Sequence, residues 1–308
     1  MAIGRLFHII HMTGELEALE KWYDDVFSVQ VMMPHSYMEG ERRDASLVLL
    51  GDCIIEPLAP TFTEPDWADF PLGRFYNRFG AHWHSIAFYT DDTVSLWRSA
   101  TAQGIRTFGE GGKPRTEEPK LDGSELNTAV MTHPKDTFTQ LEFYDPRFSP
   151  MSDPREAADW NPDWWIENHP VKTPGLAYTT IVVRDLARAE EVYVEGLGGT
   201  LLHKGSSELT GTDDVYVQLG DTVIQLSTPT REGTIAADDV AKFGDAHHAA
   251  AFKVVNLDDA EAYLNSKGIA TVARDEQTVI SDPATTFGVP FRWTSWDVPG
   301  GPRDTGAK

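Results

Sequence analysis

The sequence predicts an α+β fold built from four copies of a βαβββ module. Three observations lead to this prediction: short apolar runs with the two-residue period of strands, one amphipathic helical segment in each module, and internal repeats at long range. The first module shows the pattern, with a helix over residues 15–27 that carries Leu16, Leu19, Tyr23 and Val26 on one face. Strands are expected at residues 5–13, 28–34, 45–51 and 53–60, with a hairpin turn at Gly51 and Asp52.

The second module repeats this order from residue 82 to residue 144. The third and fourth modules are found by alignment of the chain with itself. With an offset of 170, residues 175–199 align without a gap with the start of the first module, and Tyr193 falls on Tyr23. With an offset of 164, the chain from residue 247 aligns with the second module, and His248 falls on His84.

Length and composition limit the classes of function. A chain of 308 residues is long enough for two domains of about 150 residues each. The 26 basic and 48 acidic residues give a net charge of −22, which disfavours binding to nucleic acid or to anionic membranes. The single cysteine, Cys53, excludes an intrachain disulfide, and the start of the chain does not resemble a signal peptide. We therefore expect a cytoplasmic protein, without a membrane helix because no apolar run approaches about 20 residues.

Polar residues interrupt apolar strand faces at equivalent places in the first two modules. His8 shares a face with Ile10 and Met12 on the first strand, and Glu56 lies on the last strand of that module. The second module repeats the arrangement: His84 is predicted to share a face with Ile86 and Phe88, and Glu142 to share one with Gln140.

Each of these residues, taken alone, could be a satisfied polar residue of the core or face solvent. Recurrence in equivalent strands favours a shared cation, because four such groups would be costly to bury unpaired. His82 shares a face with His84 and is an alternative ligand. His11, His35 and His203 are expected at the surface.

The module order, the histidine on strand one and the glutamate on strand four resemble the vicinal oxygen chelate superfamily, which includes glyoxalase I, methylmalonyl-CoA epimerase and type I extradiol dioxygenases. Two further segments carry the resemblance: EKWYDDVF in the first helix and HPKDT before the last strand of the second module. The resemblance implies that consecutive modules pair into two curved, cup-shaped mixed β-sheets with helices packed outside. It also implies that the first cup holds one divalent metal ion (Fe, Zn, Ni, Co or Mn), with the ligand set His8, Glu56, His84 and Glu142.

The reaction that this resemblance implies is proton transfer on a small substrate that binds the metal through two neighbouring oxygens, as in an isomerase, epimerase or lyase of the glyoxalase type. Glu56 or Glu142 would be the catalytic base. The alternative is an iron(II) dioxygenase, in which two histidines and Glu142 form a facial triad. A protein that sequesters a drug or metabolite without catalysis is the second alternative.

The second half departs from the ligand pattern. Tyr178, Gln225, His248 and Phe291 are predicted at the four ligand positions, and phenylalanine cannot bind a metal. The predicted units are therefore a metal-binding domain at 1–150, a Pro- and Trp-rich connector at 151–173, and a degenerate, dimer-mimicking domain at 174–308.

Two segments outside the modules have a distinct composition. The connector holds Trp160, Trp164 and Trp165, is too rich in proline for a helix, and should seal the seam between the domains or cap the first cup. The segment before His84 is a long link with polar and basic residues. From it and the neighbouring strands we predict a small-molecule site with Arg74, Tyr76, Asn77, Phe88 and Gln140 as substrate-binding residues. A homodimer is an open alternative for the assembly.

Overall fold

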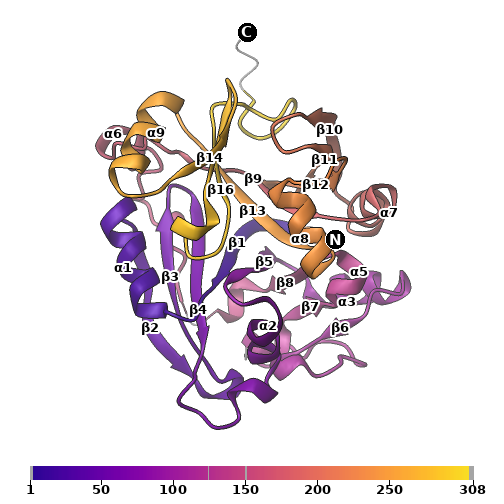
Figure 1. The fold of residues 1–308 in the computed structure, drawn as a ribbon. Coiled ribbons are helices and arrows are strands. Elements are labelled where there is room, and N and C mark those ends of the chain that lie inside the picture. Colours follow the sequence, from indigo (N-terminus) through magenta and orange to yellow (C-terminus); the bar gives the residue numbers. More distant parts are fainter. Residues whose placement is uncertain (1–2, 124, 150, 305–308) are drawn as a thin grey trace.

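Two eight-stranded mixed sheets form the centre of the protein, one in each half of the chain (Figure 1). The structure is a computed structural model, which describes residues 3–123, 125–149 and 151–304. Helices lie outside the sheets, as the sequence predicts. None of the helices in these ranges is long and apolar enough to cross a lipid bilayer.

The first sheet has the strand order β2-β3-β4-β1-β5-β8-β7-β6. Within each module the first and fourth strands are parallel neighbours, and the antiparallel pair of β1 and β5 joins the two modules into one sheet. This arrangement confirms the predicted pairing of consecutive modules. The strands are β1 Ile3–Met12, β2 Gln30–Met38, β3 Arg43–Leu50, β4 Cys53–Pro60, β5 His82–Thr90, β6 Thr107–Phe108, β7 Val130–Thr132 and β8 Gln140–Tyr144.

The second sheet repeats this order as β10-β11-β12-β9-β13-β16-β15-β14. Its strands are β9 Gly175–Val182, β10 Thr200–Ser207, β11 Thr212–Leu219, β12 Thr222–Pro229, β13 Ala246–Lys253, β14 Thr271–Arg274, β15 Thr278–Ser281 and β16 Phe291–Thr294.

The long helix of each module packs its apolar face inward. In α1 the predicted face of Leu16, Leu19, Tyr23 and Val26 is buried. Five helices, α2, α4, α5, α6 and α8, lie where none was predicted. Of these, α2 lies in the link before His84, and the five-residue α6 uses the proline-free stretch between Pro162 and Pro170 of the connector. The helices are α1 Leu16–Phe27, α2 Pro71–Phe79, α3 Thr93–Ala102, α4 Glu125–Thr128, α5 Pro134–Thr137, α6 Trp164–Asn168, α7 Leu186–Glu191, α8 Ile235–Phe243 and α9 Leu257–Ser266.

One continuous hydrophobic core runs through both halves. Helix α1 of the first half contributes to it by packing against the second sheet, where the ring of Phe27 stacks on Trp293 with 5.5 Å between centroids. The connector also belongs to this seam, because buried Trp165 donates a hydrogen bond of 2.9 Å to the carbonyl of Phe27. The connector therefore seals the two halves together, and its tryptophans do not line the first cup.

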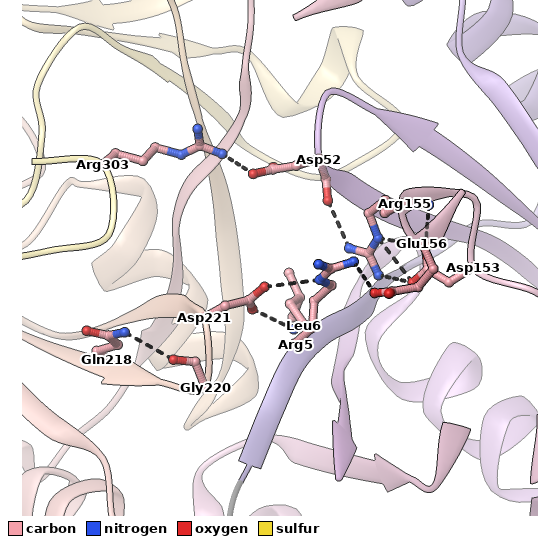
Figure 2. Close-up of polar contacts among 10 residues, drawn as sticks. All are labelled: Arg5, Leu6, Asp52, Asp153, Arg155, Glu156, Gln218, Gly220, Asp221 and Arg303. Carbon is pink, nitrogen blue, oxygen red and sulfur yellow. Dashed lines mark hydrogen bonds and ion pairs between the residues drawn. The ribbon is translucent and has the colours of Figure 1, made fainter. Parts of the chain in front are cut away.

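Ion pairs close a second part of the seam, around a cavity of about 320 Å³ (Figure 2). Asp221 of the second half accepts a 2.7 Å hydrogen bond from the backbone amide of Leu6, and Arg5 donates to Glu156 of the connector at 2.7 Å. Arg303, near the end of the chain, pairs with Asp52 in the first hairpin turn. Since these charged groups satisfy one another, this cavity is a structural joint between the halves.

Candidate functional site

The concave face of the first sheet holds a cavity of about 370 Å³. Its wall combines an apolar part, which includes Ile10 and Leu58, with a part that carries several charged and polar side chains. The polar residues that line it are Glu41, Arg43, Arg74, His84, His133, Gln140, Glu142 and Tyr144. A concave space with a few converging polar groups is typical of a small-molecule site.

A β-bulge brings His84 to this face. Ile9 pairs with Ile86 and His11 with Trp83, so three steps along β5 match two steps along β1, and one extra residue is inserted. The bulge lets both His84 and Ser85 approach Glu142 from the same side. The predicted common face of His84, Ile86 and Phe88 is therefore wrong beyond the bulge, because Ile86 and Phe88 point into the core.

Glu142 lies beside His8 in a row that crosses three strands. His8 on β1 pairs with Ala87 on β5, and Ala87 pairs with Glu142 on β8. The small side chain of Ala87 leaves space between the imidazole and the carboxylate. Glu142 is only 4% exposed.

Three donors hold the Glu142 carboxylate. Tyr144 donates to Oε2 at 2.7 Å, and Ser85 and Gln140 donate to Oε1 at 2.6 Å and 2.9 Å. The hydroxyl hydrogen of Ser85 is thereby used, so the 3.0 Å contact between His84 Nδ1 and Ser85 Oγ has the ring nitrogen as its donor. Neutral His84 then keeps an unprotonated Nε2, which is the form that binds metals.

His8 and Glu56 form the second pair of predicted ligands. Ile10, and not His8, pairs directly with Glu56 across β1 and β4, so the side chains of His8 and Glu56 meet along a diagonal. They still lie together, with 3.1 Å between His8 Nε2 and Glu56 Oε2. Both residues are buried, and neither ring nitrogen of His8 has an aligned hydrogen bond.

Arg43 and Glu41 complete the site and were not predicted from the sequence. The Arg43 guanidinium donates to Oε1 of Glu56, and its Nε lies 2.6 Å from Glu41 Oε2. Arg43 opens β3, on the far side of β4 from His8, so only the sheet order brings it to Glu56. The available signal was the charged run from Glu41 to Asp44 directly before an apolar strand.

The two glutamates that contact Arg43 differ in the direction in which their pKa values are shifted. Burial opposes ionisation of Glu56, but Arg43 and His8 outweigh it and lower the pKa of this carboxyl to about 2. Burial raises the pKa of Glu41, and the charges of Glu142 and Glu56 act in the same direction. Burial also lowers the pKa of His84 to about 4. The cup therefore contains one carboxyl that stays ionised and one that takes up a proton more readily.

The chemistry of these donors fits a divalent cation. The carboxylates of Glu41, Glu56 and Glu142 exceed the one guanidinium among them, that of Arg43, by two negative charges, and neither ring nitrogen of His8 has an aligned hydrogen bond. In the described ranges, however, no three His, Cys, Asp or Glu side chains are grouped closely enough to form a ready metal cluster. The physical reason is that Arg43 occupies Glu56 while three donors hold Glu142.

The predicted substrate-binding residues lie in different places. Arg74 and Gln140 line the cavity. Tyr76 packs against the apolar cluster around Ile10, and Asn77 is exposed on α2. Phe88 is fully buried and stacks on Phe143 in the core, so its assignment to the substrate site is corrected.

The other histidines lie in different parts of the structure. His82 lies at the seam, 3.3 Å from Asp239 of the second half, and does not line the cavity. His35 is exposed as predicted, and His203 is half-buried. His11 is fully buried, contrary to the prediction, because β1 is covered at this point by α1 and by the second half. Its Nδ1 lies 2.8 Å from the hydroxyl of Tyr23, and its Nε2 lies 3.2 Å from the carbonyl oxygen of Phe287.

The second cup differs from the prediction at one position. Ala251, the counterpart of Ala87, pairs with Tyr178 on one side and with Arg292 on the other. Arg292 and not Phe291 therefore occupies the position of Glu142, because the turn before β16 is one residue longer than the turn before β8. Phe291 lies in the core between the halves.

Comparisons with known proteins agree with this architecture. A mutant of 4-hydroxymandelate synthase from Streptomyces coelicolor superposes over 99% of this chain and 96% of its own, with a TM-score of 0.69 and 12% identity. Methylmalonyl-CoA epimerase from Mycobacterium tuberculosis matches 40% of this chain and 87% of its own, with a TM-score of 0.37 and 26% identity. No family model and no curated protein sequence matches the chain. By its module order, its paired cups and its full-length superposition, the chain has the fold of the vicinal oxygen chelate superfamily.

Proposed function

We propose that the first cup is the active site of a cytoplasmic, divalent-metal-dependent enzyme that catalyses proton transfer on a small substrate with two neighbouring oxygens. The observation that carries the proposal is a set of three carboxylates and two imidazoles at the first cup: Glu41, His84 and Glu142 line the cavity of about 370 Å³, and His8 and Glu56 are buried outside its lining. Such a set is costly to bury unless a cation compensates it.

His8, Glu56, His84 and Glu142 would hold the metal ion. The ion, when bound, supplies a Lewis acid that polarises a substrate carbonyl and stabilises the oxyanion formed next to it. The hydrogen bonds from Tyr144, Gln140 and Ser85 orient the carboxylate of Glu142, so this ligand would need little rearrangement.

Glu41 is the residue we assign to the proton transfer, in place of the earlier choice between Glu56 and Glu142. It lines the cavity and is not one of the four proposed ligands. Its carboxylate would take the proton from the carbon next to the carbonyl and return it to the neighbouring carbon, so that the substrate is isomerised without net change of charge. Glu56 is less suited, because Arg43 and His8 keep it ionised.

Arg43 and Arg74 would position the substrate. Both guanidinium groups line the cavity, and Arg74 is exposed at its mouth. Guanidinium groups bind carboxylate and phosphate oxygens with two parallel hydrogen bonds. The proposed substrate therefore carries an anionic group in addition to its two chelating oxygens.

An iron(II) dioxygenase is the second candidate. One observation favours it: Arg43 already pairs with Glu56, which leaves His8, His84 and Glu142 as a set of two histidines and one carboxylate. This is the ligand composition of a facial triad. A sequestering protein without catalysis would use the same cavity but would not need the buried carboxylates.

The decisive experiment is the metal content of protein purified without chelator, combined with an anaerobic absorption spectrum and an oxygen electrode. Zinc, nickel, cobalt or manganese without oxygen uptake is the result that we expect. Iron together with oxygen uptake on a catechol would replace the proton-transfer proposal by the dioxygenase. Protein that binds none of these metals, even after incubation with them, would contradict both.

A further inference from the structure

The two cups carry opposite charges at equivalent positions. Glu56 pairs with Ile10 on β1, and its counterpart Gln225 pairs in the same way with Thr180 on β9. Glu142 on β8 pairs with Ala87 on β5, and Arg292 on β16 pairs in the same way with Ala251 on β13. The carboxylates of Glu56 and Glu142 thus have no carboxylate counterpart at the equivalent positions of the second cup, and that of Glu142 is replaced by a guanidinium.

Arg292 is a buried cation with neutral partners. It is 2% exposed, and its Nη1 donates to Gln225 Oε1 at 2.7 Å and to Thr180 Oγ1 at 3.2 Å. Its Nε has no hydrogen-bond partner. Among the residues that the structure describes, no carboxylate oxygen lies within 4.0 Å of this guanidinium. Asp214 acts on this guanidinium only from beyond the distance of an ion pair, and burial of a charge without a direct ion pair is unfavourable, so an anion bound here would stabilise Arg292.

The neighbouring carboxylates are engaged elsewhere. Asp214 faces the same cup but accepts a 2.5 Å hydrogen bond from Ser227. Asp239 on α8 lies 2.5 Å from His248 Nδ1 and 3.3 Å from His82 Nε2. Neither carboxylate contacts Arg292.

A cavity of about 190 Å³ lies against Arg292. This volume would hold several water molecules, at about 30 Å³ each, and so is large enough for a small oxyanion. The first turn of the nine-residue helix α8 lines the cavity through Thr234, Ile235 and Ala236. The first amides of a helix and its dipole attract negative charge, and Arg231 adds a second guanidinium to the wall.

We infer that the second cup binds a small oxyanion, a carboxylate or an inorganic phosphate, between the guanidinium of Arg292 and the N-terminus of α8. The two cups would then have diverged in charge: the first is suited to a metal cation and the second to an anion. This site does not depend on the reaction proposed for the first cup.

The test is a calorimetric titration of the intact protein with inorganic phosphate and, separately, with acetate, at constant ionic strength set with sodium chloride. We expect saturable binding of one anion per chain and a higher melting temperature than in chloride alone. Tighter binding of phosphate identifies a phosphate site, and tighter binding of acetate identifies a carboxylate site.

Variants test whether the anion binds at Arg292. Arg292→Gln should weaken binding by more than about tenfold, because it removes the buried charge that pairs with the anion. Arg231→Gln changes an exposed side chain, whose contact with the fold is a hydrogen bond to the carbonyl of Glu208, and should weaken binding severalfold. Arg98→Gln, which removes an exposed guanidinium paired with Glu118 outside both cups, is the control and should leave the affinity unchanged.

Several results would overturn the inference: no saturable binding to the wild-type protein, unchanged affinity in Arg292→Gln, or an equal loss in Arg98→Gln. If Arg292→Gln does not fold, Arg231→Gln decides the question, and unchanged affinity in that variant counts against the site.

Discussion

Arg43 donates a hydrogen bond to Glu56 inside the first cup, so a carboxylate expected to bind metal already has a cationic partner. The pair is deeply buried, and Glu41 lies on the other side of the guanidinium. A metal ion and Arg43 thus act on the same negative charges. If the first cup binds metal as proposed, the stability of the protein should depend on metal in a way that can be measured.

Arg43→Met should lower the free energy of unfolding of the metal-free protein by about 3–5 kcal/mol, because it leaves two carboxylates without a counter-charge. A divalent metal should restore a large part of this loss, and more than it adds to the wild-type protein. Urea unfolding with and without zinc or manganese measures both effects. Arg98→Met, which removes an exposed pair with Glu118, is the control and should cost at most about 1 kcal/mol in either condition. Equal metal responses in Arg43→Met and wild type would contradict the prediction.

Glu142→Gln should reduce metal affinity by orders of magnitude while the secondary structure is retained. The substitution keeps the shape of the side chain but removes a negative charge from the proposed ligands. Equilibrium dialysis followed by elemental analysis measures the affinity, and circular dichroism checks the fold. Full metal retention in Glu142→Gln would refute Glu142 as a ligand.

Glu41→Gln and Glu56→Ala separate the proposed mechanisms. Under the proton-transfer proposal, Glu41→Gln should lower kcat strongly with little change in metal content, since Glu41 carries the proton and does not bind the ion. Glu56→Ala should reduce both turnover and metal affinity. A dioxygenase with three ligands should instead tolerate the loss of Glu56. Steady-state kinetics on one substrate, with metal content measured on the same samples, distinguishes these outcomes.

Each chain should bind one metal ion, in the first half. His84 and His248 lie on equivalent bulges of β5 and β13, so they form a matched pair of variants. His84→Ala should lose the metal, whereas His248→Ala should keep about one equivalent, because Arg292 repels a cation from the second cup. Elemental analysis of both variants is the measurement. Two equivalents in the wild type, or loss of metal only in His248→Ala, would reverse the assignment.

Acid should destabilise the protein partly through His11. Burial lowers the pKa of His11 to about 3, and an unfolded histidine titrates near 6.5. Below pH 6.5 the unfolded chain therefore binds more protons than the folded one, and the free energy of unfolding falls by up to about 1.4 kcal/mol per pH unit from this residue.

The contribution of His11 is thus complete above pH 6.5 and is lost as the pH falls towards 3. His11→Gln should be less stable than wild type at pH 7, and the difference should shrink at pH 5. Tyr23→Phe removes the hydroxyl beside His11 but keeps the imidazole, so its difference from wild type should be the same at both pH values. Urea unfolding at the two pH values provides the comparison. A His11→Gln curve parallel to wild type would disprove this role.

Much of the fold follows from local patterns in the sequence. The period of α1 predicts which of its residues are buried, and the repeats at offsets of 170 and 164 predict four modules with parallel first and fourth strands. Side chains alternate along a regular strand, so the common face of Gln140 and Glu142 also follows from sequence alone.

Only the tertiary structure decided the features that depend on more than one strand. A bulge of one residue turned His84 away from Phe88, and a turn lengthened by one residue put Arg292 in the place expected for Phe291. Arg43 reaches Glu56 because β3 and β4 pair, and His11 is buried because the second half covers β1. A change of one residue reverses the face of every side chain that follows it, and contacts between strands depend on their register. Neither is encoded in the period of a single segment, so the sequence determined the modules and the four residues proposed as ligands, while the packing of the strands determined the charges around those residues.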